Sequence, residues 1–142
     1  MRRLFCIASL SLASASAAAA VDTVSCTDPH GEITFSYTID GSLPQPLIGV
    51  EMQLADDFGF STEPGHPKHD GEYVSDGFKL DDMEGGDVSW DENDGDPHLA
   101  MSFRIGRAYH GAFHVIGGVV SVGGGGVWVV ECRSSAYGES GT

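Results

Sequence analysis

The chain has 142 residues, of which 41% are hydrophobic, and its 21 acidic and seven basic side chains give a formal charge of −14 at pH 7. A chain of this length is expected to form one domain around one hydrophobic core. The acidic balance argues against nucleic acid as a partner, because polyanions are bound through clusters of Lys and Arg.

The N-terminal segment has the order of a secretory signal peptide. Arg2 and Arg3 precede an apolar run at residues 4–12, and small residues fill positions 13–20. This order predicts cleavage after Ala20, and the apolar run is too short to span a bilayer as a helix. We therefore expect a periplasmic or secreted protein, with residues 21–142 as a single β domain and no membrane insertion after cleavage. That domain would keep five basic and 21 acidic side chains, a formal charge of −16.

Alternation of apolar and polar side chains is clearest in residues 32–40. Every second side chain there is apolar, and these share one face: Ile33, Phe35, Tyr37 and Ile39. A period of two is typical of a half-buried strand. The same alternation predicts strands at residues 48–54 and 99–105, with Ile48 and Leu99 on the buried faces.

Shorter segments extend the pattern to about eight strands. They cover residues 23–27, 73–80, 87–90, 108–122 and 127–132, with turns rich in Gly or Pro between them. Parity within the strands places Phe103, Phe113 and Trp128 in the core. No helix is expected after residue 20, because a 3.6-residue period is absent and the glycines, 20 in all, would weaken helix interiors. The predicted fold class is all-β and antiparallel.

Two cysteines, Cys26 and Cys132, remain after the predicted cleavage, since Cys6 leaves with the signal peptide. In an oxidising compartment they are expected to pair. Closing a loop of about a hundred residues would stabilise the fold by roughly 4–5 kcal/mol. The bridge would join the N- and C-terminal strands, which favours a closed barrel over a two-sheet sandwich because a barrel leaves no exposed edges.

The densest acidic stretch suggests a calcium site. Carboxylate and carbonyl oxygens from a flexible loop are the ligands that calcium prefers. The candidate ligands are Asp87, Asp91, Asn93, Asp94 and Asp96. Their spacing does not match an EF-hand loop, and a solvated turn between strands is the alternative. No other cofactor is expected.

No catalytic residue is assigned, because the recognisable nucleophile, zinc and phosphate-loop motifs are absent. The sequence favours a non-enzymatic binding protein for a basic protein or a small ligand. Phe58, Phe60 and Trp90 lie beside predicted turns, where aromatic side chains can line a binding pocket. A calcium-binding or carbohydrate-binding module is the alternative, and a hydrolase with an unrecognised acidic active site is the more distant one.

An early cysteine, a β-only body and a late cysteine are similar to the arrangement in small periplasmic lysozyme inhibitors, which are eight-stranded barrels. The resemblance implies a barrel, and the acidic charge of this chain would attract a basic enzyme such as a lysozyme. The Ser-Gly-x-x-Tyr motif of that family is not reproduced. At the nearest match, Asp70 replaces the serine and Tyr73 stands one place early.

Overall fold

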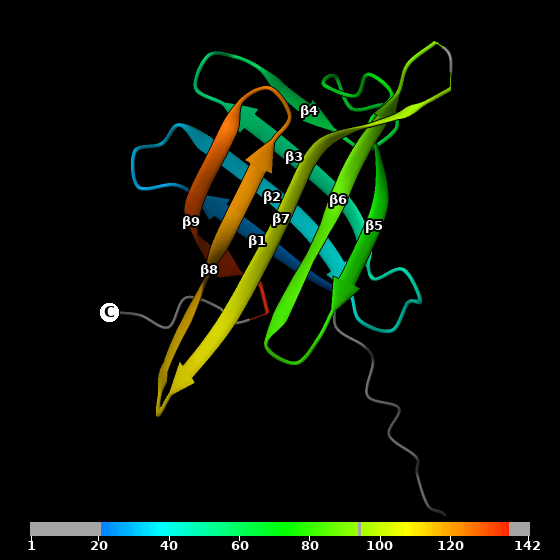
Figure 1. Ribbon diagram of the computed structural model, residues 1–142. Helices are drawn as coiled ribbons and strands as arrows, with labels where there is room; N and C mark the ends of the chain where they lie inside the picture. The colour runs from blue at the N-terminus through cyan, green and yellow to red at the C-terminus, as the bar shows by residue number, and fades with distance from the viewer. Residues whose placement is uncertain (1–20, 94, 137–142) are drawn as a thin grey trace, which may run out of the picture.

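The computed structural model describes residues 21–93 and 95–136, and they form nine β-strands (Figure 1). The strands are β1 (Val21–Thr27), β2 (Ile33–Asp40), β3 (Leu47–Leu54), β4 (Gly59–Ser61), β5 (Tyr73–Lys79), β6 (Met83–Asp91), β7 (Pro97–His110), β8 (Phe113–Val122) and β9 (Gly126–Ser134). All pair antiparallel in one sheet of order β4-β3-β2-β1-β9-β8-β7-β6-β5. These described residues include no helix long and apolar enough to cross a membrane. The predicted all-β antiparallel class is confirmed.

The first and last strands are neighbours in the middle of the sheet. Cys26 in β1 lies directly opposite Cys132 in β9, and the two form a disulfide with a Cα–Cα distance of 4.1 Å. Their side chains lie on the face that the alternation predicted, and Cys26 is buried in the core. The predicted bridge between the terminal strands is therefore confirmed.

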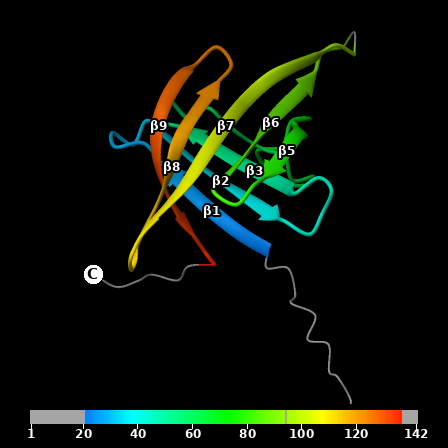
Figure 2. The same cartoon turned by 60° about the horizontal axis from the view of Figure 1, so that its bottom comes forward.

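The sheet curls around its own core into a half-barrel, as the turned view in Figure 2 shows. The curl brings β3 against β5 and β6, although no ladder hydrogen bonds join them. Leu47 of β3 fills the space over a glycine pair, Gly77 and Gly86. A Cβ atom on Gly77 would lie 2.5 Å from Leu47 Cβ, and one on Gly86 would lie 2.3 Å from Leu47 Cδ2. The contact between β3 and β5–β6, here called the seam, is therefore made by the Leu47 side chain packing on glycine backbone. The strands form one continuous sheet and not a two-sheet sandwich.

The concave face of the sheet carries the core. Three aromatic rings fill its centre, because Tyr37 and Phe35 both lie against Phe103, with ring centroids 4.7 and 5.4 Å apart. Buried aliphatic side chains from seven strands surround them: Val24, Ile33, Ile39, Val50, Met52, Val88, Met101, Ile105, Val120 and Val130. The predicted core position of Phe103 is confirmed, and Trp128 packs partly buried against the same cluster.

Two side chains predicted to be buried are exposed, because each lies at an irregularity in strand pairing. The register between β2 and β3 shifts at Ile39, so that Leu47 is buried and Ile48 is 50% exposed. The register between β6 and β7 shifts after Val88, and Leu99 is 53% exposed. A bulge inserts one residue and reverses the parity beyond it.

The predicted strand at residues 108–122 is wrong, since this segment is a hairpin. β7 continues to His110, the chain turns through Gly111, and β8 begins at Phe113. Gly111 has a φ of 60°, which glycine adopts without the steric cost of a side chain. The prediction of Phe113 as a core residue fails with it, because the side chain is 76% exposed at the tip of the hairpin. The short strand β4 brings the count to nine rather than eight.

Candidate functional site

One open end of the half-barrel holds a pocket of about 530 Å³, here called the aromatic end. Its lining comes from β4, the loop before β5, the end of β6, the start of β7 and the β8–β9 turn. The lining residues are Phe58, Phe60, Asp70, Glu72, Trp90, His98, Leu99, Ala100, Val122, Gly123 and Gly124. All three aromatic residues predicted to bind a ligand therefore meet in one pocket.

A tight turn between β3 and β4 places Phe58 at the mouth of the aromatic end. Asp57 takes a left-handed conformation with φ 69°, which Asp tolerates better than most residues. The amide of Phe58 donates to Asp56 Oδ1 at 3.3 Å, and its carbonyl accepts from the amide of Leu54 at 2.7 Å. Phe58 is consequently 53% exposed, whereas Phe60, two residues later, is buried as the floor.

Trp90 forms the opposite wall and is held from two sides. Its ring stacks on His98 with centroids 4.8 Å apart, and His98 Nε2 lies 3.6 Å from Glu92 Oε2. The next residue, Asp91, accepts a hydrogen bond from the Tyr73 hydroxyl at 2.8 Å. Trp90 still exposes 38% of its surface and lines the pocket.

The polar groups of the aromatic end are predominantly acidic. Asp70 and Glu72 contribute carboxylates, and Glu72 is ordered by the Asp70 amide, which donates to its Oε2 at 2.9 Å. The lining includes no Lys or Arg. Aromatic faces and carboxylates both attract cations, so this arrangement suits a ligand with an apolar body and a positive group.

Asp87, the first of the predicted calcium ligands, lies within β6 and has protein partners. Its Oδ1 accepts hydrogen bonds from Ser102 Oγ at 2.7 Å and from Arg104 Nη1 at 3.2 Å. Four residues of strand span about 13 Å, so Asp87 is separated from the turn that follows β6.

The other predicted calcium ligands lie at or after the end of β6. Asp91 accepts the bond from Tyr73, Asn93 and Asp96 follow it in the turn, and Asp94 lies outside the described residues. Within residues 21–93 and 95–136, no three His, Cys, Asp or Glu side chains form a group suited to a metal ion. Calcium binding stays a prediction, which a calcium-dependent rise in melting temperature would support.

The other end of the half-barrel, here called the ionic end, is filled by charged side chains. Glu84 is 1% exposed and accepts three hydrogen bonds: from the Tyr37 hydroxyl at 2.6 Å, Arg107 Nη2 at 2.7 Å and Lys79 Nζ at 2.8 Å. Arg107 Nη2 also lies 3.0 Å from Asp22 Oδ2. Two carboxylates and two cations thus balance one another inside the barrel.

Asp22 connects the ionic end to the last described residues. Its Oδ2 accepts from Ser134 Oγ at 2.6 Å, and its Oδ1 accepts from Ser135 Oγ and the Ala136 amide, both at 3.1 Å. The start of β1 and the end of β9 are therefore joined by side chains as well as by the disulfide.

Hydrogen bonds decide the ionisation of this buried cluster. Burial raises the pKa of Glu84, but hydrogen bonds from Arg107, Lys79 and Tyr37 outweigh it and hold the pKa below the ordinary value. Burial opposes ionisation of Asp22 as well, and bonds from Ser134, Ala136 and Arg107 again lower its pKa. Burial beside the Glu84 carboxylate raises the pKa of Tyr37, so its hydroxyl stays a donor. The satisfied cluster is suited to closing this end rather than to binding a ligand.

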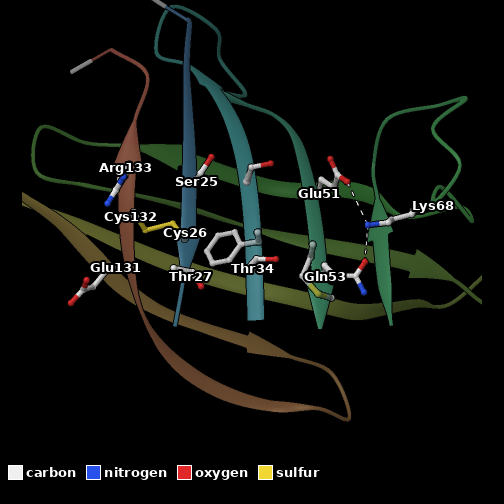
Figure 3. Close-up of a pocket in the computed structure, with 13 residues that line it drawn as sticks. Ser25, Cys26, Thr27, Thr34, Glu51, Gln53, Lys68, Glu131, Cys132 and Arg133 are labelled. Atoms are coloured by element: carbon white, nitrogen blue, oxygen red, sulfur yellow. Dashed lines mark hydrogen bonds and ion pairs between the residues drawn. A yellow bond between two sulfur atoms is a disulfide. The ribbon is translucent and has the colours of Figure 1, made fainter. Parts of the chain in front are cut away.

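A further concavity of about 710 Å³ lies on the outer face of β9, β1, β2 and β3 (Figure 3). Paired hydroxyls form its floor, because Ser25 lies opposite Ser36 and Thr27 opposite Thr34. The residues at its sides are Glu51, Gln53, Lys68, Glu131 and Arg133. Hydroxyl side chains are ordinary on the solvent face of a strand, so we assign this groove no function.

Sequence reasoning missed the ionic end, although two of its charged residues stand at strand positions where the alternation predicts a buried side chain. Asp22 shares the face of Val24 and Cys26 in β1, and Arg107 follows Ile105 by two residues in β7. A charged residue at a position of buried parity predicts a buried partner of opposite charge. The sequence does not identify that partner, because Glu84 lies 23 residues from Arg107 and 62 from Asp22.

No protein-family model matches this chain, and neither does a curated protein or a solved structure.

Proposed function

We propose that this protein is a non-enzymatic exported binding protein whose aromatic end captures an organic cation. One observation carries the proposal: Phe58, Phe60 and Trp90 converge in a pocket of about 530 Å³ whose charged side chains are the carboxylates of Asp70 and Glu72. Pockets of about 300–1,000 Å³ with apolar walls and a few polar groups are typical of small-ligand sites.

Charge favours a cation over a neutral or anionic ligand. The chain after Ala20 has a formal charge of −16, so its field concentrates cations and repels anions. Inside the pocket, Trp90 offers an aromatic face and Glu72 a carboxylate held by a hydrogen bond. Such a cation can be a free amine or a Lys or Arg side chain of a basic protein, because both join an apolar stem to a positive head.

Export is part of the proposal. The Cys26–Cys132 disulfide is consistent with an oxidising compartment, where such bonds persist. The proposed signal peptide at residues 1–20 lies outside the described residues, and its cleavage after Ala20 would be checked by N-terminal sequencing of the exported protein.

Three probes of matched shape test the choice of ligand: phenethylamine, 2-phenylethanol and 3-phenylpropionate. We expect the amine to shift the NMR signals of Trp90, Leu99 and Ala100, and to bind at least about tenfold more tightly than the alcohol, a difference of 1.4 kcal/mol. The propionate should not bind. Equal binding of amine and alcohol would refute the cation site, and shifts confined to other residues would refute the pocket.

Matched variants separate the pocket from general charge. Glu72→Gln should weaken the amine about tenfold and leave the alcohol unchanged, whereas Glu51→Gln, on the outer groove, should change neither. Inhibition of a basic lysozyme at low and high salt distinguishes the protein source of the cation. Inhibition that Trp90→Ala abolishes would place a protein side chain in the pocket, and lysozyme activity unchanged at both salts would leave the free amine as the ligand.

A further inference from the structure

The outer face of β8 and β9 is apolar although it points away from the core. Its outward side chains include Val115 and Val119 of β8 and Val127 and Val129 of β9, which are 65, 45, 70 and 69% exposed. These four residues are here called the valine face, and Phe113 extends it to the hairpin tip. Val119 pairs directly with Val129, so the side chains are contiguous across strands. Contiguous exposed apolar side chains on a small protein mark an interaction surface.

The valine face lies in a part of the described chain that carries little negative charge. Residues 97–136 contain a single carboxylate, Glu131, and three arginines, of which Arg107 points into the barrel. Residues 21–96 contain 19 carboxylates against Lys68 and Lys79, a formal charge of −17. We therefore expect a second acidic body to be repelled least over β7, β8 and β9, which lie side by side in the sheet (Figure 1).

The outer face of β7, β8 and β9 has both a raised and a recessed row of residues, so two copies of it can fit together. The pair Val119 and Val129 forms a ridge across β8 and β9. Gly117 lies two residues before Val119 on the same face of β8, and it pairs with Gly106 of β7. Because neither residue has a side chain, we infer a trough beside the ridge. A Cβ atom on Gly106 would lie in ordinary contact, 3.8 Å from the carbonyl oxygens of Asp82 and Gly117, whereas one on Gly117 would come within 2.8 Å of the Val130 carbonyl oxygen. Only the Gly106 end of the trough therefore accepts a side chain without a clash. Ridge and trough on one surface can interlock with the same surface turned about a two-fold axis.

We propose that the valine face binds the valine face of a second copy of this chain, the Val119–Val129 ridge of each entering the Gly106–Gly117 trough of the other. This arrangement buries the apolar side chains and keeps the two acidic bodies on opposite sides of the dimer.

Sedimentation velocity of the disulfide-bonded protein tests the dimer at about 0.3 mM protein, at about 50 mM and about 500 mM NaCl. We expect a dimer that becomes tighter at high salt, because salt screens the repulsion between acidic bodies without weakening apolar contact. A monomer at both salts would overturn the proposal. So would loss of monomer to neutral phosphatidylcholine vesicles without dimer formation.

Two variants test the proposed contact, one on the Val119–Val129 ridge and one in the Gly106–Gly117 trough. Val129→Asp places a charge on the ridge, and Gly106→Leu fills the trough at the one of its two glycines whose Cβ position has no contact closer than 3.8 Å. Each should weaken dimerisation at least about tenfold. Leu80→Asp, which changes an equally exposed apolar residue at the β5–β6 turn, should leave the dimer intact. If Val129→Asp does not fold, Gly106→Leu still decides the question, and an unaltered dimer in a folded Gly106→Leu protein would refute the interlock.

Discussion

The two ends of the half-barrel hold charge in opposite ways. At the ionic end, Glu84 and Asp22 are buried, and each carboxylate is matched by Arg107 and by hydroxyl or amide donors. At the aromatic end, Asp70 is exposed, Glu72 is half-buried and neither has a cationic partner in the pocket lining. The difference teaches that a carboxylate buried in this small half-barrel is satisfied by internal partners, whereas a carboxylate at the aromatic end keeps oxygens accessible to the ligand that we propose.

Removing one carboxylate charge at each end of the half-barrel tests this difference with the largest expected effect on stability. Glu84→Gln leaves Arg107 with Asp22 as its remaining carboxylate, and breaking a buried ion pair costs about 3–5 kcal/mol. Glu72→Gln should change stability by less than about 0.5 kcal/mol, as surface substitutions do. Urea unfolding of both variants measures the difference. Similar losses from the two variants would contradict the assigned roles.

The seam where β3 packs against β5 and β6 offers a second test with a smaller expected effect. Gly86→Ala forces a Cβ atom to within 2.3 Å of Leu47 Cδ2 and 2.6 Å of the Asp76 carbonyl oxygen. Overpacking of this kind costs about 1–3 kcal/mol. Thermal unfolding should show a clear drop in the midpoint.

Gly106→Ala is the matched control for the seam, because its Cβ atom has room and the residue lies in a strand of the same sheet. We expect its stability to equal or slightly exceed that of the wild type, since alanine restricts the unfolded chain more than glycine does. If both alanine variants were equally stable, the seam would not depend on the bare backbone at Gly86.

The pH dependence of stability is the third test. The pKa values of Glu84 and Asp22 are lowered in the folded protein, from ordinary values of 4.5 and 3.8. The folded state therefore binds fewer protons than the unfolded state, and this stabilisation is full above pH 4.5 and lost as the pH falls further. Melting curves between neutral and acidic pH should show the loss. Glu84→Gln should flatten the acidic limb, and an unchanged limb would mean that Glu84 does not titrate with folding.

Much of the fold could be predicted because strand alternation is a local property of the chain. The buried faces of residues 33–39 and 101–105, the cysteine pair and the adjacency of the terminal strands all follow from parity. The errors at Ile48, Leu99 and Phe113 share one cause. Each lies where a bulge or a turn changes the parity, and those are set by pairing with another strand.

The two ends of the half-barrel also differ in how much of each could be predicted from the sequence. Phe58, Phe60 and Trp90 could be singled out because aromatic residues beside turns stand out in a sequence, whereas their convergence depends on how far the sheet curls. The ionic end could not be predicted, because its members come from β1, β2, β5, β6, β7 and β9. Parity could indicate that Asp22 and Arg107 are buried, but it carries no information about which distant residues they contact.

The sequence by itself determined the β class, the acidic charge, the disulfide and which face of most strands is buried, since these depend on side-chain type and a two-residue period. Only the tertiary structure decided the closure of Leu47 over Gly77 and Gly86, the burial of Glu84 with Arg107, and the separation of acidic and valine surfaces. These features depend on the register and curl of the whole sheet, which arise when distant strands pack together.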